Sequence, residues 1–307
     1  MSAAPIIEVK NLHKSFDDIT AVNDLSFSVH EGDVYGFLGQ NGAGKSTTIR
    51  MLLTLIRPSS GRINIFGKDL HTNRHHILAQ TGAIIERPDM YKYLSAYDNL
   101  SVFAKMSGIR ITRKLIMDQL DMVGLSERSK SKVKTYSQGM KQRLGIAIAL
   151  VHDPKLIILD EPTNGLDPQG IADMRKLILR LSKELGKTVL VSSHLLSEVE
   201  LIANRMIIIH KGKKIVEGNV AELLDPSNTL VQLQTTDNTD TWNKLQSTSW
   251  APVVKRIKDE IQLVMNKKDI PALVSQLTEM KVGIIAVQPR HSLEDYFLSL
   301  TNMGSHA

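Results

Sequence analysis

A glycine-rich stretch, Gly39 to Thr47, combines a lysine with hydroxyl side chains, and these residue types bind phosphate groups. An apolar run over residues 34–38 precedes it and predicts a buried strand, and a helical pattern over 48–56 follows it. A phosphate-binding loop requires this order of strand, loop and helix. The glycines let successive amides point at phosphate oxygens, and the helix N-terminus adds partial positive charge. The candidate phosphate-binding residues are Gly39, Gln40, Asn41, Gly42, Ala43, Gly44, Lys45, Ser46 and Thr47.

Two acidic residues, Asp160 and Glu161, follow another apolar run that predicts a buried strand. A carboxylate at Asp160 can hold the Mg²⁺ that the Ser46 hydroxyl also binds, while Lys45 reaches the outer phosphates. Glu161 points to the opposite side of the strand and can polarise a water for in-line attack on the terminal phosphate. Together with the loop, the acids predict a site that binds and hydrolyses a nucleotide.

The amino-acid composition narrows the classes of protein to which the chain can belong. The chain has 307 residues, 42% of them hydrophobic and 23% charged, which suits one large globular domain or two unequal ones. It has no cysteine, its first residues do not resemble a signal peptide, and no apolar run approaches the ~18 residues that cross a bilayer. The net charge of +6 comes from residues 1–224, where the basic residues are spread out without interleaved aromatic residues, so no direct nucleic-acid binding is expected. If the protein serves a membrane, we expect it to do so from the cytosol through a partner.

Two parts of the chain differ in their patterns. Residues 1–224 predict an α/β domain whose helical part spans about 88–151, with a further amphipathic helix expected from Ile171 to Leu185. Asp225-Pro226-Ser227-Asn228 predicts the boundary. Residues 225–307 predict a small α+β domain in the order βαββαβ, which suits a ferredoxin-like unit. The expected elements there are a strand at 230–234, a helix at 240–246, a hairpin at 253–265, a helix at 271–279, a strand at 282–287, and a last helix opened by a capping box at Ser292.

In this order the motifs resemble the ATP-binding subunits of ABC transporters, over about residues 6–220. The matching stretches are Phe16 in the place of the A-loop aromatic, Gly39 to Thr47 in that of the Walker A loop, Leu156 to Glu161 in that of Walker B with its catalytic glutamate, Gly165 to Pro168 in that of the D-loop, and His194 in that of the switch histidine. Phe16 is expected in the loop after the first strand, where by itself its ring either stacks on a base or packs against neighbours. The resemblance implies that Phe16 stacks on adenine, that His194 contacts the γ-phosphate, and that Asp167 links two sites across a dimer. It also implies the fold, a P-loop ATPase domain with a RecA-like core, an antiparallel β subdomain and a helical subdomain.

The family signature, usually Leu-Ser-Gly-Gly-Gln, departs from its pattern here. Ser137 and Gly139 are retained, whereas Gln138 and Met140 replace a glycine and a glutamine. A small hydroxyl and a glycine at a helix N-terminus can still meet a phosphate. In the family that phosphate belongs to the ATP of the other subunit. The resemblance therefore implies a head-to-tail homodimer, or a heterodimer of two ABC subunits, with two shared ATP sites.

A second departure is Glu86, at the end of a predicted strand where the family usually has glutamine. A glutamate there would add negative charge beside Mg²⁺, Asp160 and Glu161. Together with the Pro and the Tyr-rich loop that follow, Glu86 makes this sequence resemble the bacitracin-resistance and lantibiotic-immunity exporters. The other interpretation is a local substitution without meaning for the substrate. Tyr91, Tyr93 and Tyr97 of that loop either form a groove for a partner helix or pack locally.

The resemblance implies an ATPase with ATP and Mg²⁺ as cofactors, which lies on the inner face of the membrane, works with a transmembrane permease, and exports an antimicrobial peptide, drug or similar compound. The competing class is a soluble ABC-type ATPase that acts on nucleic acid or the ribosome. Such proteins generally carry coiled-coil insertions or tandem ATPase units, and this sequence has neither. A nucleotide-binding regulator without turnover is disfavoured by the intact Glu161.

Overall fold

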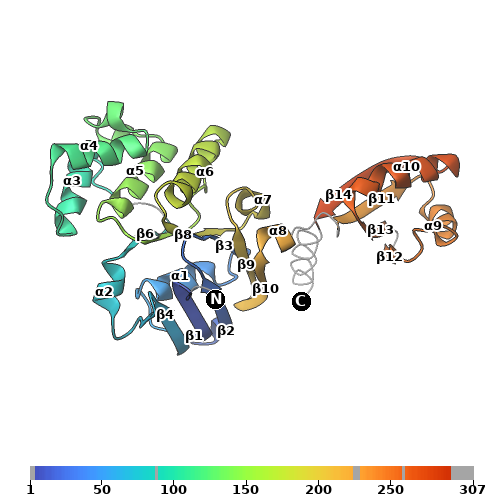
Figure 1. The fold of residues 1–307 in the computed structure, drawn as a ribbon, viewed down its shortest axis with the longest axis horizontal. Coiled ribbons are helices and arrows are strands. Elements are labelled where there is room, and N and C mark those ends of the chain that lie inside the picture. The colour runs from blue at the N-terminus through green and yellow to red at the C-terminus, as the bar shows by residue number, and fades with distance from the viewer. Residues whose placement is uncertain (1–3, 87–88, 224–228, 258–259, 292–307) are drawn as a thin grey trace. The chain divides into compact units, whose positions relative to one another are not determined.

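The computed structural model describes residues 4–86, 89–223, 229–257 and 260–291. They belong to two compact units, Met1–Asn219 and Val220–Ala307, which are described separately (Figure 1). The boundary expected at 225–228 and the last helix expected from Ser292 lie outside the described residues. Within the described ranges, no helix combines the length and apolarity that crossing a membrane requires.

The first unit is built on a six-stranded sheet in the order β10-β9-β3-β8-β7-β6. Its strands are β3 (Val34–Leu38), β6 (Thr81–Ile84), β7 (Leu156–Leu159), β8 (Thr188–Ser193), β9 (Arg205–His210) and β10 (Lys213–Asn219). All pairs are parallel except β9 with β10, which form a hairpin. Every residue of β3, β7 and β8 is buried, as expected of parallel strands that are covered on both faces.

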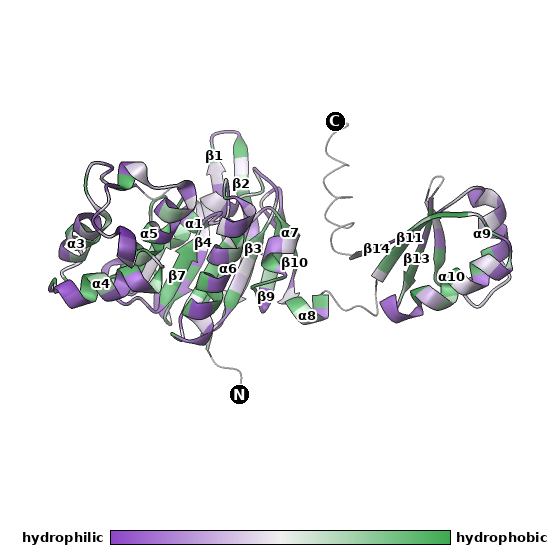
Figure 2. Ribbon diagram, turned by 90° about the horizontal axis from the view of Figure 1, so that it is seen from above, coloured by the Kyte–Doolittle hydropathy of each residue, from purple (hydrophilic) through white to green (hydrophobic). Residues whose placement is uncertain are grey.

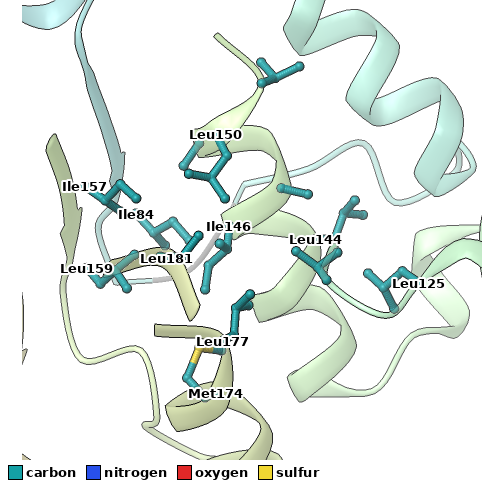
Figure 3. Close-up of a cluster of buried hydrophobic side chains, with 14 of the residues drawn as sticks. Ile84, Leu125, Leu144, Ile146, Leu150, Ile157, Leu159, Met174, Leu177 and Leu181 are labelled. Atoms are coloured by element: carbon teal, nitrogen blue, oxygen red, sulfur yellow. The ribbon is translucent and has the colours of Figure 1, made fainter. Parts of the chain in front are cut away.

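The two faces of this sheet pack into different hydrophobic clusters. Ile157 and Leu159 lie in a cluster with the helices α5 (Gln138–Leu150) and α6 (Pro168–Lys183), as Figure 3 shows. Leu156 and Ile158, which point the other way, pack with α1 (Lys45–Leu52) and with the second sheet. The continuous apolar run of β7 thus joins both clusters, and it places the residues that follow Leu159 at the carboxyl edge of the sheet.

The second sheet of this unit is antiparallel, in the order β2-β1-β4-β5. Its strands are β1 (Ile7–Phe16), β2 (Ile19–Val29), β4 (Ser60–Ile65) and β5 (Lys68–Asp69). The pairing of β1 with β2 continues to Phe16 and Ile19, so Phe16 is the last residue of a strand. The expectation of Phe16 in a loop was wrong because the hairpin turn is only two residues long.

Helices occupy the expected part of the chain between β6 and β7. They are α3 (Ala96–Met106), α4 (Arg113–Met122) and α5, with 3₁₀ turns at Ser126–Arg128 and Val133–Thr135. The side chains of Ser95, Thr112 and Ser137 cap these helices. The short helices α2 (Arg74–Leu78) and α7 (Leu196–Val199) complete the unit. Helix α6 begins at Pro168, earlier than the expected Ile171, because Asp167 caps it and proline is favourable in a first turn.

The second unit is a four-stranded antiparallel sheet in the order β12-β13-β11-β14. Its elements are α8 (Val220–Leu223), β11 (Thr229–Thr235), α9 (Asn238–Gln246), β12 (Val254–Ile257), β13 (Glu260–Met265), a 3₁₀ turn (Lys267–Asp269), α10 (Ile270–Glu279) and β14 (Ile284–His291). This order confirms the predicted ferredoxin-like unit. Figure 2 shows hydrophobic residues along β11 and β13, where Val231, Leu233, Ile261 and Leu263 form the core with Leu273 and Leu277 of α10.

Candidate functional site

The loop between β3 and α1 is held open by two glycines in the left-handed region, Gly42 with φ of 81° and Gly44 with φ of 103°. A Cβ at Gly44 would lie 2.5 Å from the Ala21 carbonyl oxygen of β2, so only glycine fits there. Lys45 is the first residue of α1 and is 5% exposed. Its Nζ donates to the carbonyl oxygens of Gly39 at 2.5 Å and Gln40 at 3.3 Å, which places the ammonium inside the curve of the loop.

Asp160 directly follows β7 and is 1% exposed. Its Oδ1 accepts a hydrogen bond from Ser192 Oγ at 2.5 Å, whereas Oδ2 is buried and has no hydrogen-bond partner among the described residues. The Ser46 side chain lines the same pocket, a cavity of about 430 Å³. A hydroxyl and a buried carboxylate oxygen with a free lone pair are hard oxygen donors of the kind that Mg²⁺ takes. The residues present therefore fit the metal.

Glu161 lies between two basic side chains. Its Oε1 is 3.2 Å from Lys45 Nζ, and its Oε2 is 2.8 Å from His194 Nδ1. The backbone of Glu161 is left-handed, with φ of 49°, which is uncommon for a residue other than glycine and turns the chain out of the strand direction. Three stretches that are far apart in the sequence thus meet at one carboxylate, because β3, β8 and β7 are neighbours in the sheet.

Glu86 follows β6 and lines the same pocket as Ser46, Asp160 and Glu161. Its carboxylate forms an ion pair with the Arg50 guanidinium of α1, and the Glu86 and Arg50 side chains are 63% and 42% exposed. The positive charge of Arg50 therefore lies next to the negative charge that Glu86 adds to the site. No local pattern in the sequence indicates this pair, since the two residues are 36 positions apart.

Phe16 lies at the end of β1 with 44% of its surface exposed, and Lys14 Nζ is 4.7 Å from its ring centroid. The Phe16 ring is therefore not packed inside a core.

In the loop after Glu86, Tyr91 contacts Phe103 and is 53% exposed, and Tyr93 is 79% exposed. Tyr97, in contrast, packs against the helical cluster.

Ser137 caps α5, and its Oγ accepts from Met140 N at 3.3 Å. The cap leaves Ser137 and Gln138 exposed at the helix start, with Gly139 in the first turn. Asp167 caps α6 by accepting from Gly170 N at 3.0 Å. Of these residues only Gln138 lines the described pocket that contains Asp160 and Glu161.

Two residues at the site were not expected from the sequence, Arg50 and Ser192. A signal for Ser192 did exist, because it stands two positions before His194, on the same face, and directly follows the apolar residues of β8. A serine in a buried strand is common, so only the contact with Asp160 indicates a role for Ser192.

Comparison with known proteins agrees with this geometry. The family model for ABC transporters matches residues 22–164. A bacitracin transport ATP-binding protein from Bacillus licheniformis is 41% identical over 302 residues, covering 98% of this chain and 98% of that protein. A lantibiotic transport ATP-binding protein from Streptococcus pyogenes is 45% identical over 212 residues, covering 69% of this chain and 90% of that protein.

Among solved structures, cbiO1 from Clostridium perfringens, described as part of the ABC transporter complex cbiONQ, superposes with a TM-score of 0.66. It is 27% identical and covers 79% of this chain and 94% of its own. The predicted ABC ATPase fold is confirmed, and the relatives favour a transporter subunit over the competing class that acts on nucleic acid or the ribosome. This chain belongs to the ABC transporter family, as an ATP-binding subunit that hydrolyses ATP.

Proposed function

We propose that this chain powers the export of peptide antibiotics, or compounds like them, through a transmembrane permease, and that it works at the inner face of the cell membrane. The observation that carries the substrate class is the match to a relative named for bacitracin transport, because it extends over 98% of the chain and so includes the second unit. The relative named for lantibiotic transport points to the same class of peptide.

The ATP site is proposed to be complete only between two cassettes, either two copies of this chain or this chain and a related one. Phe16 stacks on the adenine, and the amides of the loop over 39–47 surround the phosphates. Ser137 and Gly139 of a second cassette close over the γ-phosphate. Support comes from the exposed N-terminus of α5, a 13-residue helix whose first amides favour an anion. Asp167, at the start of α6, links the two sites.

Lys45 is proposed to change partners when ATP binds. It now contacts the Gly39 carbonyl and Glu161, and the terminal phosphates offer it a stronger charge. Its departure frees Glu161 Oε1. Glu161 then orients the attacking water, while His194 holds Oε2 and meets the γ-phosphate.

Ser46 and Asp160 are the residues that would hold Mg²⁺, with Glu86 and its partner Arg50 close by. The buried Asp160 Oδ2 without a hydrogen-bond partner supports this assignment. When bound, the ion would supply positive charge against the terminal phosphates.

The permease is proposed to dock beside the segment that follows Glu86. A cavity of about 610 Å³ lies between α2 and the end of α3, where Leu78, His152 and the 71%-exposed Met106 line it. A short segment of the permease would fill this cavity. Opening of the two cassettes after hydrolysis would then move that segment.

The test uses a bacitracin-sensitive Gram-positive host that expresses this chain with a candidate permease. Resistance to bacitracin or to a lantibiotic should rise only when both proteins are present, and Glu161→Gln should abolish the increase at equal protein level. Full ATP hydrolysis by the assembled complex without protection against either compound would refute the proposed substrate class.

A further inference from the structure

We propose that Ser192 is a positioning residue for both acids of the site, and that it sets the metal affinity and the placement of the attacking water. A single hydroxyl connects the two acids. Ser192 Oγ donates to Asp160 Oδ1 at 2.5 Å and accepts from the backbone N of Glu161 at 2.9 Å. The inference rests on the roles proposed above for Asp160 and Glu161.

The sheet places Ser192 beside the acids. Strands β7 and β8 are parallel and pair Leu159 with Val191, so Ser192 is level with Asp160, where β7 ends. Ser192 is fully buried, and so is the Asp160 carboxylate apart from 1% of its surface. Water therefore cannot replace the hydroxyl without a rearrangement of the strand ends.

The first consequence concerns Asp160. The hydrogen bond from Ser192 to Oδ1 restricts rotation of the Asp160 carboxylate. The other oxygen, Oδ2, then has a fixed direction and no hydrogen-bond partner among the described residues. Without Ser192 Oγ, both oxygens would be buried and unsatisfied, which is costly. The carboxylate would then turn toward other donors, and the metal would lose a pre-oriented ligand. Loss of such outer partners typically reduces metal affinity or activity by about 10–100-fold.

The second consequence concerns Glu161. Its left-handed backbone, with φ of 49°, persists only if its surroundings hold it. The hydrogen bond from its N–H to Ser192 Oγ is one such restraint. It fixes where the side chain leaves the backbone, and so where the carboxylate meets Lys45 and His194.

The plainer reading is that Ser192 only satisfies a buried donor, and Ser193 provides the matched control. Ser193 is 2% exposed, and its hydroxyl donates to Glu198 Oε2 at 3.0 Å and to the Leu195 carbonyl oxygen at 3.4 Å, and accepts from Leu195 N at 3.0 Å. It is the next residue on the same strand and points to the opposite face. No described contact joins its side chain to Asp160 or Glu161. Replacing either serine with alanine therefore removes a buried hydroxyl that both donates and accepts hydrogen bonds.

The experiment measures how Mg²⁺ tightens the binding of a fluorescent ATP analogue, in a Glu161→Gln background so that hydrolysis does not interfere. Ser192→Ala should raise the half-saturating Mg²⁺ concentration about 10–100-fold. Its affinity for the analogue in EDTA and its thermal transition should stay close to those of Ser193→Ala. Ser192→Thr, which keeps the hydroxyl, should retain tighter Mg²⁺ binding than the similarly shaped Ser192→Val. With Glu161 present, Ser192→Ala should also lower kcat while KM for ATP changes little.

An Mg²⁺ titration of Ser192→Ala that matches Ser193→Ala would overturn the inference, and so would equal curves for the threonine and valine variants. Failure of Ser192→Ala to fold, with Ser193→Ala folded, would also count against it, because the serine would then be a structural requirement. If Glu161→Gln alone hydrolyses ATP normally, the proposed catalytic role fails. If it is inactive while Ser192→Ala behaves as wild type, only the inference about Ser192 fails.

Discussion

The carboxylate of Glu161 is joined to the imidazole of His194, with Oε2 and Nδ1 2.8 Å apart. The second oxygen of the same carboxylate is 3.2 Å from the Lys45 ammonium. The side chain is therefore held at both oxygens, by one residue from the phosphate loop and one from the end of β8. A change in either contact moves the group that we propose as the general base.

Replacing Glu161 with glutamine should leave ATP binding intact and lower turnover by about 10²–10⁴-fold, the usual effect of losing a general base. The amide keeps the shape of the side chain and can still contact His194, but it cannot accept the proton of water. ATPase assays and nucleotide titrations measure the two effects separately. Glu184→Gln is the control, because Glu184 follows the end of α6, is exposed, and forms an ion pair with Arg180 of that helix, away from the site. Unchanged hydrolysis in Glu161→Gln would remove Glu161 from the role.

Gly139→Asp should prevent ATP-dependent dimerisation, because a carboxylate at the start of α5 would face the γ-phosphate. We expect dimer affinity to fall by at least about a hundredfold, since like charges across an interface cost several kcal/mol. The fold should survive, because a Cβ at Gly139 has no neighbour closer than Leu166 Cδ2 at 3.8 Å. Size-exclusion chromatography with ATP in the Glu161→Gln background gives the readout. The neutral variant Gly139→Asn separates charge from size, and a normal dimer of Gly139→Asp would contradict the shared site.

Glu86→Gln should bind ATP as wild type does but require more Mg²⁺ for half-maximal activity, because it removes a negative charge from the pocket. Arg50→Gln should shift the requirement in the opposite direction, since it leaves the Glu86 charge uncompensated. Both side chains are well exposed, so each shift should be at most about fivefold. Mg²⁺ titrations of ATPase activity measure it. Superimposable curves for the two variants and wild type would show that the acid is incidental to the metal.

Tyr35 links protein stability to pH. Burial raises the pKa of its hydroxyl well above 10.0, and the adjacent Glu217 carboxylate raises it further. The folded protein therefore keeps this proton at pH values where the unfolded chain loses it, so the free energy of unfolding should decrease as the pH rises above about 10. Tyr35→Phe should remove that part of the slope and cost about 1.5–3 kcal/mol at pH 7, because the hydroxyl donates to Glu217 at 2.8 Å.

Denaturant unfolding between pH 7 and pH 11 measures this difference. Tyr93→Phe is the control, because it removes the same hydroxyl from a side chain that is 79% exposed. Equal slopes for Tyr35→Phe and wild type would contradict the assignment.

Much of the site follows from local patterns. A glycine-rich turn contains Lys45, and the ends of two largely apolar strands are followed by Asp160 and His194. Such local patterns can be recognised in the sequence. The order βαββαβ of the second unit is visible for the same reason, since strand and helix periods differ. The ends of helices and strands were predicted less accurately. Strand β1 extends to Phe16 and helix α6 begins at Pro168, whereas the patterns predicted a loop at Phe16 and a later helix start. Strand pairing and helix caps decide where an element ends.

The sequence by itself predicted a phosphate-binding loop at Gly39–Thr47, placed Asp160 and Glu161 at a strand end, and indicated that two domains follow one another, because these features depend on residues close together in the chain. The tertiary structure decided which groups touch. It set Glu161 between Lys45 and His194, gave Glu86 the partner Arg50, and placed the Ser192 hydroxyl between the two acids. These contacts arise where the order of strands in a sheet brings distant segments side by side, and a single sequence carries no local signal of that order.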